Sequence, residues 1–156
     1  MRDTETPCPN CGNPTTAGWA ICQSCLRRYI EDIGSLAHVI PALRALADRT
    51  ARIGGRSHTP SRGVAPLPIS THWQEQWERA SRLMLDIAST IDIRYSLLRP
   101  ESWRKAWRKA ISNRNSLASS DRTPDLMLDL HATLIDLDGM MRERDLHRSA
   151  VIVLCC

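Results

Sequence analysis

Apolar residues recur at helical intervals along most of the chain, and this pattern predicts a mainly helical protein. The most regular stretch follows Ser70 and Thr71, which offer a cap for a helix of about 20 residues. Its apolar seam consists of Trp73, Trp77, Ala80, Met84, Ile87 and Ile91. A seam with this spacing fits either core packing within one chain or the interface of a homodimer.

A second seam lies in the last third of the chain, after a capping Thr123 and a first-turn Pro124. The seam residues are Met127, Leu130, Leu134, Leu137 and Met141, and the aspartates between them predict an acidic outer face. His131 stands beside this seam with no second ligand-type residue one turn away, so we expect it at the surface. The chain closes on an apolar tail that ends in Cys155 and Cys156, which fits a packed or frayed end or, in a eukaryotic chain, a prenylation signal.

The first apolar stripe in chain order consists of Leu26, Tyr29, Ile30, Ile33 and Leu36. It predicts a helix after the last of the clustered cysteines, and this helix leads into an expected helical pair over residues 31–52. Pro41 is expected in the first turn of a second helix, where its missing N–H costs little.

Four cysteines near the N-terminus form two C-x-x-C pairs separated by ten residues: Cys8, Cys11, Cys22 and Cys25. Four thiolates at this spacing close a tetrahedral shell around one structural Zn²⁺. Gly12, directly after the second cysteine, suits a backbone with positive φ. The alternation of Trp19 and Ile21 predicts a short strand, and with it a hairpin between the two cysteine pairs.

Other roles for these cysteines fit less well. A disulfide framework needs an oxidising compartment, and the polar residues 1–6 lack the apolar core of a signal peptide. A thioredoxin-type site has a single C-x-x-C in a βαβ pattern, and a catalytic zinc keeps an open position. We therefore expect a metal that stabilises the fold.

Composition and charge limit the remaining choices. The chain has 156 residues, a net charge of +4 and no phenylalanine, so tryptophan and aliphatic side chains must fill the core. Its mildly basic balance permits nucleic acid as a partner. No apolar run approaches the roughly 18–20 residues that span a bilayer, so we expect a cytoplasmic protein without a membrane partner.

Two basic segments carry the candidate nucleic-acid contacts. Residues 49–74 contain no acidic side chain and hold arginines among glycines and prolines, which fits a solvated loop or a basic arm along phosphates. Residues 102–111 repeat W-R-K-A, with Trp103 and Trp107 on one helix face and basic residues on the other. This helix fits phosphate contact with base stacking, or a core helix with a charged outer face. The candidate contacts are Arg52, Arg56, Arg62, Arg104, Lys105, Arg108 and Lys109.

The predicted architecture is a mainly α protein in which a four-cysteine zinc ribbon or knuckle packs on a helical domain of four to five helices. Its expected parts are the zinc ribbon (1–30), the helical pair (31–52), a basic Gly/Pro linker (53–70), the helical domain (71–148) and the apolar tail (149–156). The sequence contains no P-loop, nucleophile elbow or H-E-x-x-H motif, so we expect no enzyme. The predicted function is binding and regulating nucleic acid or a nucleic-acid machine. The alternative is a zinc-stabilised module that docks on a host or partner protein.

The cysteine motif, the Arg49-to-Ile53 stretch leading to Pro66-Leu67-Pro68, and the Trp-rich helix together resemble a group of actinobacterial and actinophage proteins. These proteins combine an N-terminal zinc ribbon with a helical domain, and their activity is not established. The resemblance covers about residues 8 to 145 and implies the fold and the zinc. Longer members continue into a second cysteine-rich module and sometimes a helix-turn-helix, whereas this sequence ends at Cys156 without a further C-x-x-C pair.

Overall fold

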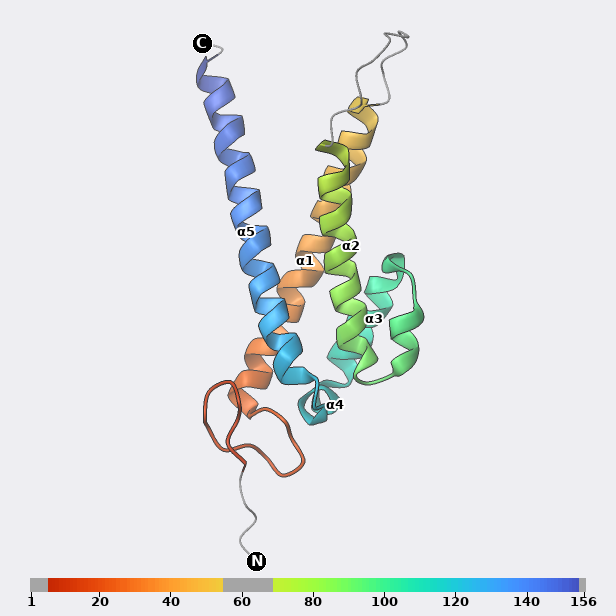
Figure 1. Cartoon of the computed structure of the whole chain (residues 1–156), viewed down its shortest axis with the longest axis vertical. Helices are drawn as coiled ribbons and strands as arrows, with labels where there is room; N and C mark the ends of the chain where they lie inside the picture. The colour runs from red at the N-terminus through yellow and green to blue at the C-terminus, as the bar shows by residue number, and fades with distance from the viewer. Residues whose placement is uncertain (1–5, 55–68, 155–156) are drawn as a thin grey trace, which may run out of the picture.

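Three long helices dominate the molecule, and shorter helices join them at one side (Figure 1). The computed structural model describes the backbone of residues 6–54 and 69–154 and the side chains of residues 6–49 and 71–145. Within these ranges the long helices are α1 (Gln23–Gly54), α2 (Ile69–Ser89) and α5 (Thr123–Leu154). The short elements are η1 (Ile93–Leu97), η2 (Pro100–Ser102), α3 (Trp103–Ser112) and α4 (Arg114–Ser119). The predicted fold class is confirmed, with five α-helices and no sheet in the described part of the chain.

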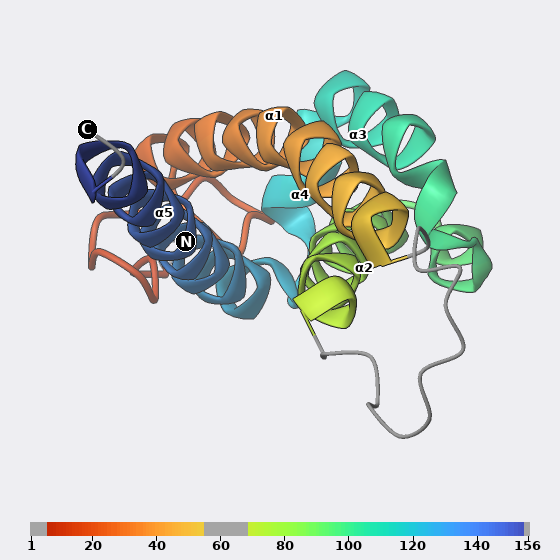
Figure 2. The same ribbon diagram turned by 90° about the horizontal axis from the view of Figure 1, so that it is seen from above.

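One hydrophobic core holds these elements together. Helices α1 and α2 form the most extensive pair, and α3 packs mainly on α2. Helix α5 contacts both α1 and α2 and then diverges from them toward its C-terminus, as both views show (Figures 1 and 2). Tyr29, Leu43, Met84 and Leu130 are among the fully buried side chains at the centre.

The seam predicted on α2 lies in this core. Trp77, Ala80, Met84 and Ile87 are buried, and Trp73 packs on them half-buried. The seam is therefore covered within one chain and needs no second copy to bury it. From α3, Trp103 is buried in the same core, and Trp107 is half-buried against it.

The predicted helix break before Pro41 is wrong, because α1 continues through this residue. A proline in a helix interior costs about 3 kcal/mol through a lost hydrogen bond and a clash with the preceding turn. Leu36, Ile40 and Leu43, on both sides of it, are fully buried. Each of these side chains contributes about 1.5–3 kcal/mol when buried, which together outweighs the proline. The expected helical pair over 31–52 is thus the C-terminal part of one helix.

The predicted strand at Trp19 and Ile21 is also absent. Within residues 6–54 the only β-type contact is an isolated bridge between Pro7 and Pro14. Ile21 is fully buried against the helical core, so its apolar side chain reflects burial and not a strand.

At the other end of the chain, the helical path of α5 runs without a break from Thr123 into the predicted tail, as far as Leu154. Residues 155–156 and most of the predicted linker lie outside the described residues. No helix in the described part of the chain is long and apolar enough to cross a bilayer.

Candidate metal centre

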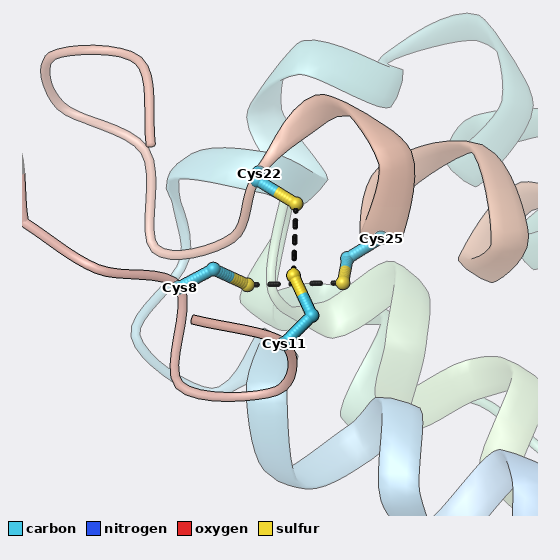
Figure 3. A group of neighbouring side chains, drawn as sticks. All are labelled: Cys8, Cys11, Cys22 and Cys25. Atoms are coloured by element: carbon cyan, nitrogen blue, oxygen red, sulfur yellow. Dashed lines mark hydrogen bonds between the residues drawn. The ribbon is translucent and has the colours of Figure 1, made fainter. Parts of the chain in front are cut away.

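Four cysteine sulfurs meet at the N-terminal end of α1 (Figure 3). The Sγ atoms of Cys8, Cys11, Cys22 and Cys25 all lie within 4.8 Å of one another. The Cys8 and Cys25 sulfurs are 3.7 Å apart, and those of Cys11 and Cys22 are 3.4 Å apart. None of the four forms a disulfide. The sequence prediction that these four residues converge on one point is confirmed.

The first pair is held by a tight turn. The N–H of Gly12 donates to the carbonyl of Cys8 at 2.8 Å, and the N–H of Cys8 donates to the carbonyl of Asn13 at 2.7 Å. Gly12 has a φ of +76°, as predicted, and this left-handed conformation is strained for any residue with a Cβ. The turn therefore depends on glycine for its backbone conformation.

The second pair comes from the start of α1. Cys22 directly precedes the helix, Cys25 lies in its first turn, and the N–H of Leu26 donates to the carbonyl of Cys22 at 2.9 Å. Unpaired N–H groups and the positive end of the helix dipole favour negative charge at this position. Thiolates are the form in which cysteine binds metal, so the helix start suits the site.

The thiols influence one another strongly. Burial raises the pKa of Cys8, but hydrogen bonds from the backbone, with that of Cys22 first, outweigh it and lower the pKa to about 7. Burial, together with hydrogen bonds to the neighbouring thiols, raises the pKa of Cys25 above the usual range. Four sulfurs this close cannot all ionise without a cation to balance the charge, which is what a divalent metal supplies.

The donor set fits one structural metal ion such as zinc. Four sulfurs with no nitrogen or oxygen ligand favour a soft, tetrahedral ion, and no coordination position is left for a reacting water. In the part of the chain that the structure describes, no other group of histidine, cysteine or acidic side chains has this arrangement. His131, predicted at the surface, is indeed exposed, with its Nδ1 3.6 Å from a carboxylate oxygen of Asp32.

The segment that carries the cysteines also contacts α4 and α5, through residues that the sequence pattern does not reveal. The N–H of Ala20 donates to the carbonyl of Ala118 in α4 at 2.7 Å. The side-chain amide of Asn10 lies 3.4 Å from the sulfur of Met127 in α5. These pairs are about a hundred residues apart in sequence, and no local periodicity signals them. The cysteine unit is therefore a part of the helical core and not an appended module.

The basic residues of the W-R-K-A helix lie where the pattern predicts. Arg104, Lys105 and Arg108 are exposed, and Lys109 is half-buried. Helix α3 buries Trp103, Ala106 and Ala110 on its opposite face. Arg52 lies in the last turn of α1, but its side chain is outside the described set, and Arg56 and Arg62 lie outside the described residues altogether.

No protein-family model, no curated protein and no solved structure matches the chain.

Proposed function

We propose that this protein is a non-enzymatic, zinc-stabilised helical scaffold that binds nucleic acid through the outer face of α3. The metal fixes the corner at which α1, α4 and α5 meet, and α3 presents its basic side chains to phosphates. We also propose that the protein is related to the zinc-ribbon proteins of actinobacteria and their phages that its sequence resembles.

The observation that carries the proposal is the unbalanced charge of α3. Arg104, Lys105 and Arg108 are exposed within about one helical turn. Several arginines elsewhere are held by carboxylates, as Arg44 is by Asp48 at 3.3 Å, whereas no ion pair among the described residues involves α3. A cation without a carboxylate partner can bind a phosphate without first breaking an ion pair, and this binding releases the counterions held by the nucleic acid.

The position of the tryptophans narrows the mode of binding. Trp103 is buried and Trp107 is half-buried against the core, so base stacking on these rings requires the helix to leave its place. The guanidinium of Arg104 lies 5.3 Å from the Trp103 ring centre and keeps its outer N–H groups available. We therefore expect phosphate contacts without base readout.

A charge-reversal pair tests the proposal. Changing Arg104 and Arg108 together to Glu should abolish most binding to duplex DNA of any sequence, because phosphate contacts carry no base identity. In wild type the logarithm of affinity should fall with the logarithm of salt, by about 0.9 for each phosphate contact. Fluorescence anisotropy on labelled duplexes over a salt series measures both effects.

The matched control reverses two exposed arginines elsewhere, Arg28 on α1 and Arg142 on α5. Both double variants bring the formal net charge from +4 to zero, so they match in total charge, and the control in addition loses the ion pair of Arg142 with Asp138 at 2.9 Å. The control should bind far better than the α3 variant. Equal binding by the two variants, with both folded, contradicts a site on α3.

A second candidate function rests on exposed aliphatic side chains. Leu128 and Ile135, seven residues apart on one side of α5, are 62% and 60% exposed, and neighbouring exposed aliphatic side chains are typical of surfaces that bind protein. In this alternative the protein is an interaction module for a host or partner protein. Recovery of one stoichiometric partner from nuclease-treated host extract would favour it over nucleic-acid binding.

A further inference from the structure

The four cysteines of the metal centre differ in their exposure to solvent. Cys11 is exposed, whereas Cys8, Cys22 and Cys25 are buried, with exposed fractions of 2%, 4% and 7%. The residues directly before and after Cys11 are exposed as well, and a Cβ placed on Gly12 would meet no atom within 4 Å. A small molecule in water can therefore reach Cys11 more readily than the other three.

Each cysteine of the first pair has a partner sulfur in the second pair. The Sγ atoms of Cys11 and Cys22 are 3.4 Å apart, and those of Cys8 and Cys25 are 3.7 Å apart (Figure 3). Both contacts join the tight turn at Gly12 to the start of α1. These contacts pair the sulfurs across the two C-x-x-C motifs and not within one motif.

We propose that Cys11 is a site of oxidation by hydrogen peroxide, and that Cys22 then forms a disulfide with the oxidised sulfur. The inference rests on the metal-binding part of the proposed function and is independent of nucleic-acid binding. A bound divalent metal keeps all four sulfurs as thiolates, so the four cysteines differ in access and not in charge. Access therefore selects Cys11, and proximity selects Cys22.

The reaction has two steps and consumes one peroxide for each disulfide. The Cys11 thiolate attacks one oxygen of hydrogen peroxide, the O–O bond breaks, hydroxide leaves, and the sulfur becomes a sulfenic acid. The Cys22 thiolate then attacks this sulfur, forms the S–S bond and displaces a second hydroxide. The two sulfurs together lose two electrons, which reduce the peroxide to two hydroxide ions.

The disulfide removes two of the four ligands from the metal centre. A sulfur in a disulfide is no longer a thiolate, so only Cys8 and Cys25 remain as ligands. A structural zinc site uses four ligands, so we expect the zinc to be lost with the first disulfide. A second peroxide can then join Cys8 to Cys25 by the same two steps. A thiol reductant breaks both disulfides by exchange, so zinc and reductant together should restore the starting state.

The test uses the full-length, zinc-loaded protein with Cys155→Ser and Cys156→Ser, so that the cysteines of the metal centre are the only thiols. Zinc content before treatment checks the metal-binding premise separately. Hydrogen peroxide is added below one equivalent, with dimedone in one sample to trap the sulfenic acid. In a second sample the free thiols are alkylated, the disulfides are reduced, and the released thiols receive a different label. Fragment-ion spectra locate each label, and a zinc-binding dye measures the released metal.

Dimedone should fall mainly on Cys11, and the second label should fall equally on Cys11 and Cys22, with about one zinc released for each first disulfide. In guanidinium chloride with a chelator all four thiols are accessible, so the preference for Cys11 should disappear. A preference that persists there overturns the role of access. A first label on a buried cysteine, a first disulfide within one C-x-x-C motif, or zinc retained after the disulfide forms overturns the proposal. A preparation without zinc before treatment overturns the metal centre itself, and the proposal with it.

Discussion

Tyr29 shows how a single side chain in this core can work against stability. Its ring is fully buried in α1, yet its hydroxyl has no hydrogen-bond partner among the described residues. A buried polar group without a partner costs about 1–3 kcal/mol relative to a satisfied one. The apolar ring therefore stabilises the fold while the hydroxyl reduces that gain.

Replacing Tyr29 by Phe should leave the free energy of unfolding unchanged or raise it by about 1 kcal/mol, since only the unsatisfied hydroxyl is removed. Urea denaturation of the zinc-loaded protein at neutral pH measures this difference. A loss of more than about 1 kcal/mol would mean that the hydroxyl has a partner in solution.

The same residue sets a pH dependence. Burial raises the pKa of Tyr29 above its usual range, and the nearby charge of Arg122 only partly offsets this. The pKa of Tyr29 in the folded protein lies above its unfolded value of about 10. The contribution of this residue to stability is therefore fully present below about pH 10 and is lost as the pH rises above it. The Phe variant lacks this contribution, so its advantage over wild type should widen as the pH rises above about 10. A constant difference across that range would contradict a buried phenol.

The sequence predicts individual long helices better than any other feature of the fold. The seams of α2 and α5 repeat at helical spacing, and Thr123 starts α5 where the cap and proline signals place it. The predicted helix break at Pro41 and the predicted strand at Trp19 and Ile21 are wrong. In both places the burial of apolar side chains in the core outweighs the local preference of the residues for a break or a strand. The hydrogen bond from Ala20 to Ala118 cannot be inferred from the sequence around either residue.

Helix α1 offers a direct test of how much burial outweighs propensity. Pro41 is exposed in the helix interior, and it lacks the N–H that would donate to the carbonyl of Ala37. Replacing it by Ala should raise the free energy of unfolding by about 1–3 kcal/mol, because the missing bond and the helix propensity are both restored. Thermal and urea unfolding measure the change. A destabilised variant would show instead that the packing of α1 on α2 depends on the local bend that proline imposes.

Taken as a whole, the molecule has one core that includes the cysteines. Cys8, Cys22 and Cys25 belong to the same buried cluster as the helices, and so does Ile21. The sequence predicts a zinc unit over residues 1–30 that packs on a helical domain, but short-range motifs cannot show which distant helices it touches. The contacts of Ala20 and Asn10 with α4 and α5 make the metal site a corner of the helical core.

Loss of the metal should therefore weaken the entire protein. A structural zinc contributes about 10–16 kcal/mol in small zinc-finger peptides, which is comparable with the whole stability of a domain of this size. Chelation, or a Cys11→Ser change, should lower the helical signal and change the tryptophan fluorescence in one transition. A helical signal that keeps its wild-type melting temperature after complete metal removal would mean that the cysteine unit folds apart from the helices.

We expect Cys8, Cys11, Cys22 and Cys25 to hold one structural metal ion, on which the rest of the fold depends. The most direct test is metal analysis of freshly purified protein combined with X-ray absorption at the zinc edge. We predict one zinc per chain, bound by four sulfurs at about 2.3 Å with no nitrogen or oxygen neighbour, and loss of that zinc in the Cys11→Ser variant. A content well below one zinc per chain, or a first shell that includes oxygen or nitrogen, would contradict the account.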